Sequence, residues 1–203
     1  MIDLTTTTRV KAFLGAGGTV LSTAQDTVIG QLISMYSARF EKELGREIET
    51  TERTEQYDVE EGQRLITLRA FPVVSVESIR NDLTRLFDAS AEIESDLFYV
   101  DMRRGTIAFD WTELLPGPGT LLITYTAGMT EEGATDPTAS FVENYPDLAM
   151  AVDMQVAETL RRKDRLGATN LSFQGGGVGY EAALKLLPEV RAALDSHRRV
   201  FAR

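Results

Sequence analysis

The sequence predicts an α+β protein in which helices from both ends of the chain form a bundle and an antiparallel β-sheet is inserted between them. Two long stretches, Thr23–Gly45 and Pro146–Arg165, repeat apolar residues at helical spacing. The chain between them is rich in threonine and β-branched residues and is broken by turn signals. Because the apolar positions of each long helix extend over two faces, we expect the two helices to pack together and to leave apolar flanks for a second partner.

Four helices are expected. Leu4–Leu14 begins at a threonine run that offers an N-cap, and glycines end it. Asp26 suits the first turn of Thr23–Gly45, and Pro146 suits the first position of Pro146–Arg165. Pro188–Phe201 closes the chain. The apolar positions of the first long helix are Ala24, Val28, Ile29, Leu32, Ile33, Met35, Tyr36, Phe40 and Leu44.

Six strands are expected between the long helices, and they are Glu49–Tyr57, Arg64–Arg69, Val73–Ile79, Leu97–Asp101, Thr106–Phe109 and Thr120–Thr126. No crossover helix fits between successive strands, so we expect the sheet to be antiparallel throughout. The tripeptide at 103–105, Arg-Arg-Gly, is typical of a hairpin turn. The Pro-Gly-Pro-Gly run at 116–119 indicates a break before the last strand.

The remaining segments are expected to connect these elements. Asp82–Asp96 is interpreted as an excursion at one end of the sheet, and Gly167–Gly179 as flexible or extended chain. The polar segment Gly128–Glu143 is interpreted as a loop. The predicted domains are therefore a helical domain of residues 1–47 plus 144–203, a β-rich insertion of residues 48–128, and a connecting loop of residues 129–143.

The composition is that of an ordinary globular chain of 203 residues, 43% apolar and 26% charged, long enough for one sizeable domain or two small ones. The absence of cysteine excludes a disulfide framework and thiol chemistry. There is no apolar run long enough to cross a bilayer, and the N-terminal sequence MIDLTTTTRVK lacks the pattern of a secretory signal. We therefore expect synthesis in a reducing cytoplasm and no membrane partner.

The net charge of −10 is unevenly distributed. Residues 1–160 carry 12 Lys and Arg against 27 Asp and Glu, a net of −15, and residues 161–203 carry 9 against 4, a net of +5. Such an acidic body disfavours DNA recognition through a basic face, because phosphates require neutralising cations. It favours association with further copies or with an acidic partner of the basic tail, although a solvated tail helix with scattered charges is the alternative.

The residues that usually perform chemistry do not form a convincing site. The single histidine, His197, has arginines beside it. The sequence has no cysteine and no serine in a G-x-S-x-G motif that could act as a nucleophile with this histidine as its base, so His197 is interpreted as an exposed helix-end residue. The acidic pairs at 60–61 and 131–132 lie in turn-like sequence and are interpreted as solvated loops rather than cation ligands. Catalytic, cofactor-binding and metal-ligating residues are therefore expected to be none.

Two other patterns have a structural and a functional interpretation. The glycine-rich run at 175–179 lacks the Lys-Ser/Thr of a phosphate loop and indicates a hinge or arm. The segment Glu41–Glu61 holds nine acids against three bases, which is typical of a solvated face. The alternative for this acidic segment is a wall along which DNA passes without binding.

The order of several loose motifs resembles that of the head–tail connector proteins, also called adaptor or head-completion proteins, of long-tailed bacteriophages and their prophage relatives. The motifs, in chain order, are LTTTTRVKAFLG, ARFEKELGREI, RLITLRAFPVVSVESI, FYVDMRRGTIAF, LLITYTAGM, YPDLAMAVDMQVAETLRRKD and LLPEVRAALDSHRR. Together they extend over nearly the whole chain. Asp82–Asp96 and Gly128–Glu143 are the segments that depart from the family pattern.

The resemblance implies a structural, non-enzymatic protein of the phage neck. About a dozen copies would form a ring on the portal, extend the DNA channel without reading its sequence, and bind the next neck or tail protein. The hypothesised portal or subunit contacts lie in the basic C-terminal segment: Arg191, Leu194, Arg198, Arg199, Phe201 and Arg203. The hypothesised ring-interface residues are Met150, Met154, Arg161 and Arg162.

Other functions fit the sequence less well. Within the same assembly, the chain would be a tail-completion protein on the tail side of the joint. A hydrolase using paired carboxylates would need two acids that converge in a pocket with separated pKa values, and no pair in the sequence stands out. A small regulatory binding module is a third possibility, and monomeric behaviour at all concentrations would favour either of the last two.

Overall fold

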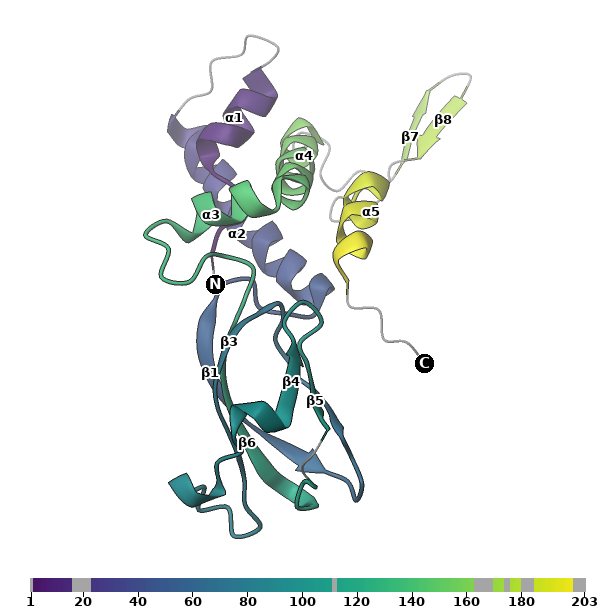
Figure 1. The fold of residues 1–203 in the computed structure, drawn as a ribbon. Coiled ribbons are helices and arrows are strands. Elements are labelled where there is room, and N and C mark those ends of the chain that lie inside the picture. Colours follow the sequence, from purple (N-terminus) through teal and green to yellow (C-terminus); the bar gives the residue numbers. More distant parts are fainter. Residues whose placement is uncertain are drawn as a thin grey trace. The chain divides into compact units, whose positions relative to one another are not determined.

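The computed structural model describes residues 2–15, 23–110, 113–162, 170–173, 176–179 and 185–198 (Figure 1). The chain divides into two compact units. A helical unit is made of Met1–Gly45 with Asp136–Arg203, and a β unit is made of Arg46–Thr135. The domain division predicted from sequence, with a helical domain of 1–47 plus 144–203, an insertion of 48–128 and a loop of 129–143, stays a prediction.

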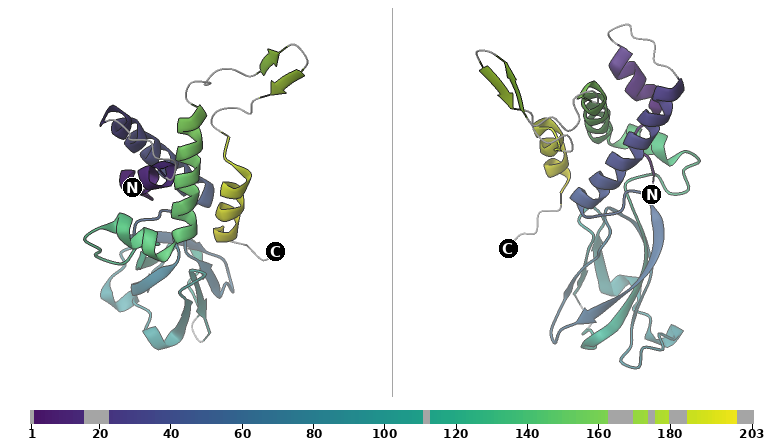
Figure 2. Two further views of the ribbon diagram at one scale, coloured as in Figure 1. Left: turned by 90° about the horizontal axis from the view of Figure 1, so that it is seen from above. Right: turned by 180° about the vertical axis from the view of Figure 1, so that it is seen from behind.

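The helical unit is organised around one helix from the C-terminal half. Its elements are α1 (Thr7–Gly15), α2 (Thr23–Leu44), α3 (Pro137–Asn144), α4 (Pro146–Arg162), α5 (Pro188–His197) and a hairpin of β7 (Asn170–Phe173) and β8 (Gly176–Gly179). Helix α4 packs against α1, α2, α3 and α5, and the views of Figures 1 and 2 agree that it lies between α5 and the two N-terminal helices. The predicted bundle from the two ends of the chain is therefore confirmed.

The predicted contact between the two long helices is also confirmed. The hydroxyl oxygens of Tyr36 on α2 and Thr159 on α4 lie 2.8 Å apart in a buried hydrogen bond. Tyr36 and Phe40 have no exposed surface, and these aromatic side chains contribute most to the burial of α2. Val28 and Met35, however, are 44% and 40% exposed, so one flank of α2 stays apolar and open.

The β unit is a sandwich of two antiparallel three-stranded sheets. Its strands are β1 (Thr51–Val59), β2 (Leu65–Thr67), β3 (Val73–Asn81), β4 (Phe98–Asp101), β5 (Thr106–Phe109) and β6 (Gly117–Ala127). One sheet has the order β1-β6-β3 and the other β2-β5-β4. Every pairing is antiparallel, as the sequence predicts, and the hairpin turn at 102–105 joins β4 to β5.

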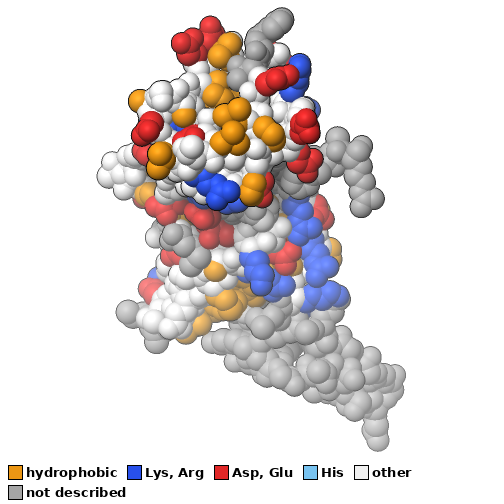
Figure 3. All heavy atoms as spheres, turned by 90° about the horizontal axis from the view of Figure 1, so that it is seen from below, with side chains coloured by type: hydrophobic (Ala, Val, Ile, Leu, Met, Phe, Trp, Pro, Cys, Tyr) orange, Lys and Arg blue, Asp and Glu red, His pale blue; other side chains and the backbone are white. Residues whose placement is uncertain are grey.

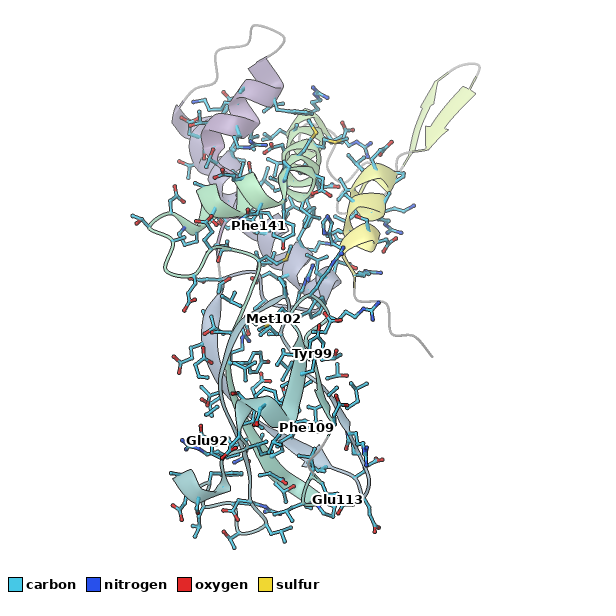
Figure 4. The ribbon with its side chains drawn as sticks, viewed as in Figure 1. Glu92, Tyr99, Met102, Phe109, Glu113 and Phe141 are labelled. Atoms are coloured by element: carbon cyan, nitrogen blue, oxygen red, sulfur yellow. The ribbon has the colours of Figure 1, made fainter. Side chains whose placement is uncertain are left out.

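The core of the β unit lies between the two sheets. Alternate residues of each strand point inward, so that Ile107 and Phe109 of one sheet face Ile123 and Tyr125 of the other, and all four are fully buried. Figure 4 shows Phe109 between the sheets. The same period-2 pattern that predicts the strands therefore decides which side chains form the core.

Four features differ from the sequence prediction. The predicted loop 129–143 contains most of α3, because Asp136 caps the helix by accepting a hydrogen bond from the Ala139 N–H at 3.0 Å and a proline follows at its first position. Pro118 does not break β6, since the strand begins at Gly117 where its pairing with β1 is irregular. Part of 167–179 forms the β7–β8 hairpin, and α5 ends at His197 rather than Phe201.

Candidate functional site

The C-terminal helix α5 is fixed along its inner face to the rest of the helical unit. Val190 and Leu194 are buried, and α5 packs against α4 and α2. Before the helix begins, the side chain of Gln155 on α4 accepts a hydrogen bond from the Leu187 N–H at 2.9 Å and donates one to the Lys185 carbonyl at 3.4 Å. Gln155 therefore determines where α5 starts on the surface of α4.

Two polar contacts fix the C-terminal end of α5. Nε2 of His197 lies 2.7 Å from a carboxylate oxygen of Asp147, in the first turn of α4. The guanidinium of Arg198 donates to the backbone carbonyl of Glu43 at 3.0 Å and to the carboxylate of Glu43 at 2.8 Å, and it also lies 3.1 Å from Asp195. The described chain therefore ends beside the C-terminus of α2.

These contacts give the hypothesised portal residues different environments. Arg191 is exposed on α5. Leu194 is only 1% exposed, because it packs in the core of the helical unit, so it is not available as a contact residue. Arg198 is exposed but already paired with Glu43 within the chain. The last three hypothesised residues, Arg199, Phe201 and Arg203, lie outside the described part of the chain.

Three of the four hypothesised ring-interface residues lie on one narrow open stripe of α4. Met150 is 51% exposed, Met154 is half-buried and Arg161 is exposed. At helical spacing these three point to the same side of the helix. Arg162 is turned away from them and pairs with Glu158 one turn earlier. The stripe is therefore apolar at its centre and basic toward the C-terminal end of α4.

Sequence reasoning missed the polar contacts that join the helices of this unit. Gln155 lies 32 residues from Leu187, and Arg198 lies 155 residues from Glu43. A further example is Asp153, a buried residue of α4 that accepts hydrogen bonds from the Thr5 hydroxyl and the Arg9 guanidinium. No local pattern points to partners at these separations.

The two units differ sharply in charge. The β unit contains 8 Arg and 18 Asp and Glu, so it carries a net charge of −10. The remaining chain contains 13 Lys and Arg and 13 Asp and Glu, a net of zero. The whole net charge of the protein therefore resides in the β unit, which is a poor surface for attracting phosphates.

One carboxylate of the β unit is held between two buried tyrosines. Tyr125 donates a hydrogen bond to Glu55 at 2.9 Å, and Tyr57 donates a second, shorter bond to the same oxygen. Burial raises the pKa of both tyrosines, so they stay protonated and keep donating. Glu55 thereby links β1 to β6.

Within the described residues, no three His, Asp or Glu side chains gather closely enough to hold a metal ion. The same part of the chain has no helix long and apolar enough to span a membrane. The acidic pairs at 60–61 and 131–132 are exposed in turns, as the sequence predicts.

Comparison with solved structures identifies chains with a similar fold. A chain in the neck of an empty GTA particle, computed with C6 symmetry, is 20% identical, with a TM-score of 0.57 over 97% of this chain and 90% of that chain. A chain in the virion of a native gene transfer agent (GTA) particle is 19% identical, with a TM-score of 0.57 over 96% and 90%. A chain in the neck of a native GTA particle, computed with C12 symmetry, is 20% identical, with a TM-score of 0.52 over 97% and 92%.

The comparison with protein families extends over nearly the full length. The family model described as head completion protein matches residues 3–200 of the 203-residue chain. Among curated proteins there is no match. A match of this extent includes both the helical unit and the β unit, and it covers all the sequence motifs quoted above. The chain therefore belongs to the head completion protein family.

Proposed function

We propose that this head completion protein forms a ring of identical copies on the portal of a tailed, phage-like particle and joins the head to the tail. The observation that carries the proposal is the family match over residues 3–200. The similar folds found in the necks of GTA particles, solved with C6 and C12 symmetry, support a cyclic arrangement in the neck of the virion. In this role the ring extends the DNA channel and performs no catalysis.

Two open apolar stripes of the helical unit support the ring. Met150 and Met154 form one on α4, and Val28 and Met35 form the other on α2. A ring requires a heterologous contact, in which one surface of each copy meets a different surface of the next. We assign the α4 stripe, with Arg161 at its basic end, to one side of that contact and the α2 stripe to the other. Arg162 is left out because it pairs with Glu158.

The basic C-terminal segment is the proposed portal contact. It begins with the exposed Arg191 and continues through Arg199 and Arg203, beyond the anchor that Arg198 makes with Glu43. Basic residues at the end of an anchored helix suit an acidic surface on the portal. Leu194 and Arg198 hold α5 in place and are not themselves assigned to the contact.

The test is binding of the purified protein to the isolated portal, followed by sedimentation and negative-stain microscopy. The proposal predicts one ring per portal. A variant that combines Arg191→Glu with removal of residues 199–203 should lose portal binding by tenfold or more while its thermal unfolding is unchanged, because α5 and its buried side chains remain. Arg103→Glu, in the exposed turn between β4 and β5, is the matched control and should bind normally. Normal portal binding by the C-terminal variant would refute the contact, and binding to finished tails instead of the portal would favour a tail-completion protein.

A further inference from the structure

Three loops gather at one end of the β unit. Because the strands are antiparallel, the connections 60–64 and 82–97, and the described residues 110 and 113–116 before β6, all lie at the end where β1 and β3 finish and β6 begins. The chain enters and leaves the β unit at the opposite end, where Thr51 and Val73 both pair with Ala127. Figure 4 shows this separation, with Glu92 and Glu113 toward the loop end and Met102 toward the other.

The loop end displays large apolar side chains to solvent. Leu86 is 72% exposed and Leu83 is 58% exposed, and both belong to the connection between β3 and β4. Leu115, in the neighbouring connection, is 42% exposed. Isolated exposed leucines are common, but a group of them on adjacent loops is typical of an interaction surface.

The leucine-bearing loop is held in a defined conformation rather than left loose. The carboxylate of Asp82 accepts hydrogen bonds from the N–H groups of Thr84, Leu86 and Phe87, at 2.8, 2.9 and 2.9 Å. Phe87 is buried beneath the loop. Arg85 and Phe87 both adopt positive φ, at 60° and 51°, which side chains other than glycine rarely do. This fixed conformation presents Leu83 and Leu86 outward.

A second pair of hydrogen bonds joins the neighbouring connection to the last residue of β3, directly before the first loop. The side chain of Asn81 accepts from the Leu115 N–H at 2.5 Å and donates to the Leu115 carbonyl at 3.3 Å. The backbone that carries the three leucines is therefore fixed at this end of the β unit, which reduces the entropy lost when a partner binds.

Acidic side chains surround these leucines. The three loops contain nine Asp and Glu against two Arg, Arg64 and Arg85. Eight of the nine acids are exposed, and the ninth, Asp82, is engaged in the loop itself. Figure 3 looks at the molecule from below and shows hydrophobic side chains grouped together with Asp and Glu side chains near them. The exposed acids of this surface are Glu60, Glu61, Asp88, Glu92, Glu94, Asp96, Asp110 and Glu113, of which Glu92 pairs with Arg80 of β3 at 3.6 Å.

We infer that this acidic leucine surface, made of Leu83, Leu86, Leu115 and the acids around them, docks the protein that joins on the tail side of the ring. The inference rests on the proposed function and deepens it. Charge complementarity defines the partner as a protein with an apolar groove bordered by Lys and Arg. A second copy that approached with this same surface would be repelled, because it presents the same acids, and nucleic acid is disfavoured for the same reason.

The sign of the charge also separates this surface from the portal contact. A portal surface that accepts the basic C-terminal segment is acidic, so it would repel the acidic leucine surface. The portal contact and the acidic leucine surface therefore have opposite charge, which disfavours binding of either partner at the other partner's surface.

The test is a joining reaction in vitro. DNA-filled heads from a strain that lacks this protein are mixed with purified variants and with extract of the same strain, which supplies tails and every other component. The measurements are the protein that sediments with heads alone and the yield of tailed particles. Leu83→Ser with Leu86→Ser is the test variant, and Val74→Ser, an exposed apolar residue at the opposite end of β3, is the matched control. Both should unfold at the wild-type temperature, since the replaced side chains are exposed.

The inference predicts that the double leucine variant binds heads normally and gives at least about tenfold fewer tailed particles, because buried apolar anchors dominate interfaces. Asp88→Lys with Glu113→Lys should also lower the yield, and the Val74→Ser control should not. Normal joining by the leucine variant would overturn the inference, as would loss of head binding, which would place the portal at this surface. Failure of the wild-type protein to bind heads would refute the proposed function itself, and with it this inference.

Discussion

Asp153 illustrates how a single buried carboxylate holds the N-terminal segment on α4. Its side chain accepts hydrogen bonds from Thr5 at 2.5 Å and from Arg9 at 3.2 Å, and it is only 3% exposed. Burial raises its pKa, while Thr5 and Arg9 oppose that rise. These two donors stabilise the carboxylate form against the cost of burial.

Replacing this carboxylate should destabilise the protein. Asp153→Ala leaves the buried Thr5 hydroxyl without its acceptor, and we expect a loss of about 2–3 kcal/mol in the free energy of unfolding, measured by urea denaturation. Arg9→Ala should have a smaller effect, because the Arg9 side chain is 39% exposed and returns partly to water. Equal stability of Asp153→Ala and the wild type would contradict this account.

Asp82 gives a pH dependence with a definite sign. Hydrogen bonds from the side chain and backbone of Thr84, and from the N–H groups of Phe87 and Leu86, lower its pKa. A lowered pKa means that the folded loop favours the carboxylate, so the contribution is present above about pH 4, the ordinary value for Asp, and is lost as the pH falls through the lowered value. We expect amide exchange at Leu86 and Phe87 to be slow at pH 6 and to accelerate, after correction for intrinsic rates, below pH 4. Unchanged protection in Asp82→Ala would disprove the role of this residue.

At the residue scale, apolar periodicity predicts well and polar partners are not predicted. Tyr36, Phe40 and Leu44 are buried, as the spacing in α2 indicates. Leu194 is equally periodic, yet the sequence places it among the hypothesised contacts, because sequence alone does not tell which apolar face meets the same chain and which meets another. Asp153 could not be found, since its partner Thr5 lies 148 residues away.

At the scale of elements, the backbone at Gly128, just after β6, lies so close to Thr50, just before β1, that there is no room for a side chain at residue 128. A Cβ atom at Gly128 would lie 2.3 Å from Cα of Thr50 and 2.5 Å from its backbone nitrogen. Thr50 in turn donates hydrogen bonds to Thr130, from its N–H at 2.9 Å and from its hydroxyl at 2.6 Å. Glycine is therefore required where the chain enters and leaves the β unit.

Two glycine-to-alanine replacements should act in opposite directions. Gly128→Ala forces the backbone at Thr50 to move, and we expect it to lower the free energy of unfolding by at least about 2 kcal/mol. Gly30→Ala, in the middle of α2, meets no atom within 4 Å and should raise stability by about 0.5–1 kcal/mol through helix propensity. Thermal unfolding of both variants provides the measurement, and a stabilised Gly128→Ala would contradict the close approach.

Element positions in the β unit were predictable because the period-2 pattern and the turn residues agree. Thr106–Phe109 is predicted to the residue, and Val73–Asn81 within two residues at its end. Helix α3 was missed because it is short and follows a run of loop-forming residues, although Asp136-Pro137 is a start signal. Pro118 indicates a break in the sequence, because the irregular pairing that tolerates this proline at the start of β6 cannot be read from sequence.

At the scale of the whole molecule, each unit encloses its own core, and this predicts separable folding. A fragment of residues 46–135 contains all six strands of the sandwich and the whole apolar layer between its sheets. We expect it to fold alone, with dispersed amide resonances and a cooperative thermal transition. The replacement Ile123→Ala in this fragment should lower the midpoint temperature of that transition, because it leaves a cavity between the sheets. A fragment with no cooperative transition would show that the β unit does not fold by itself.

Fold class and family were accessible from sequence at this scale because the order of motifs runs through the entire chain. The site was less accessible. The uneven charge was visible, but its confinement to the β unit, with the helical unit neutral, depends on which segments fold together. The leucines at the loop end were not singled out, since Asp82–Asp96 has no periodicity and its conformation is fixed by the hydrogen bonds of Asp82.

The most direct test of the central claim, that this protein joins head to tail, is electron microscopy of the particles made when its gene is deleted. The account predicts DNA-filled heads and finished tails in normal numbers that stay separate, with joining restored when the purified wild-type protein is added to the extract. Tailed particles in the deletion strain at wild-type yield would contradict the account.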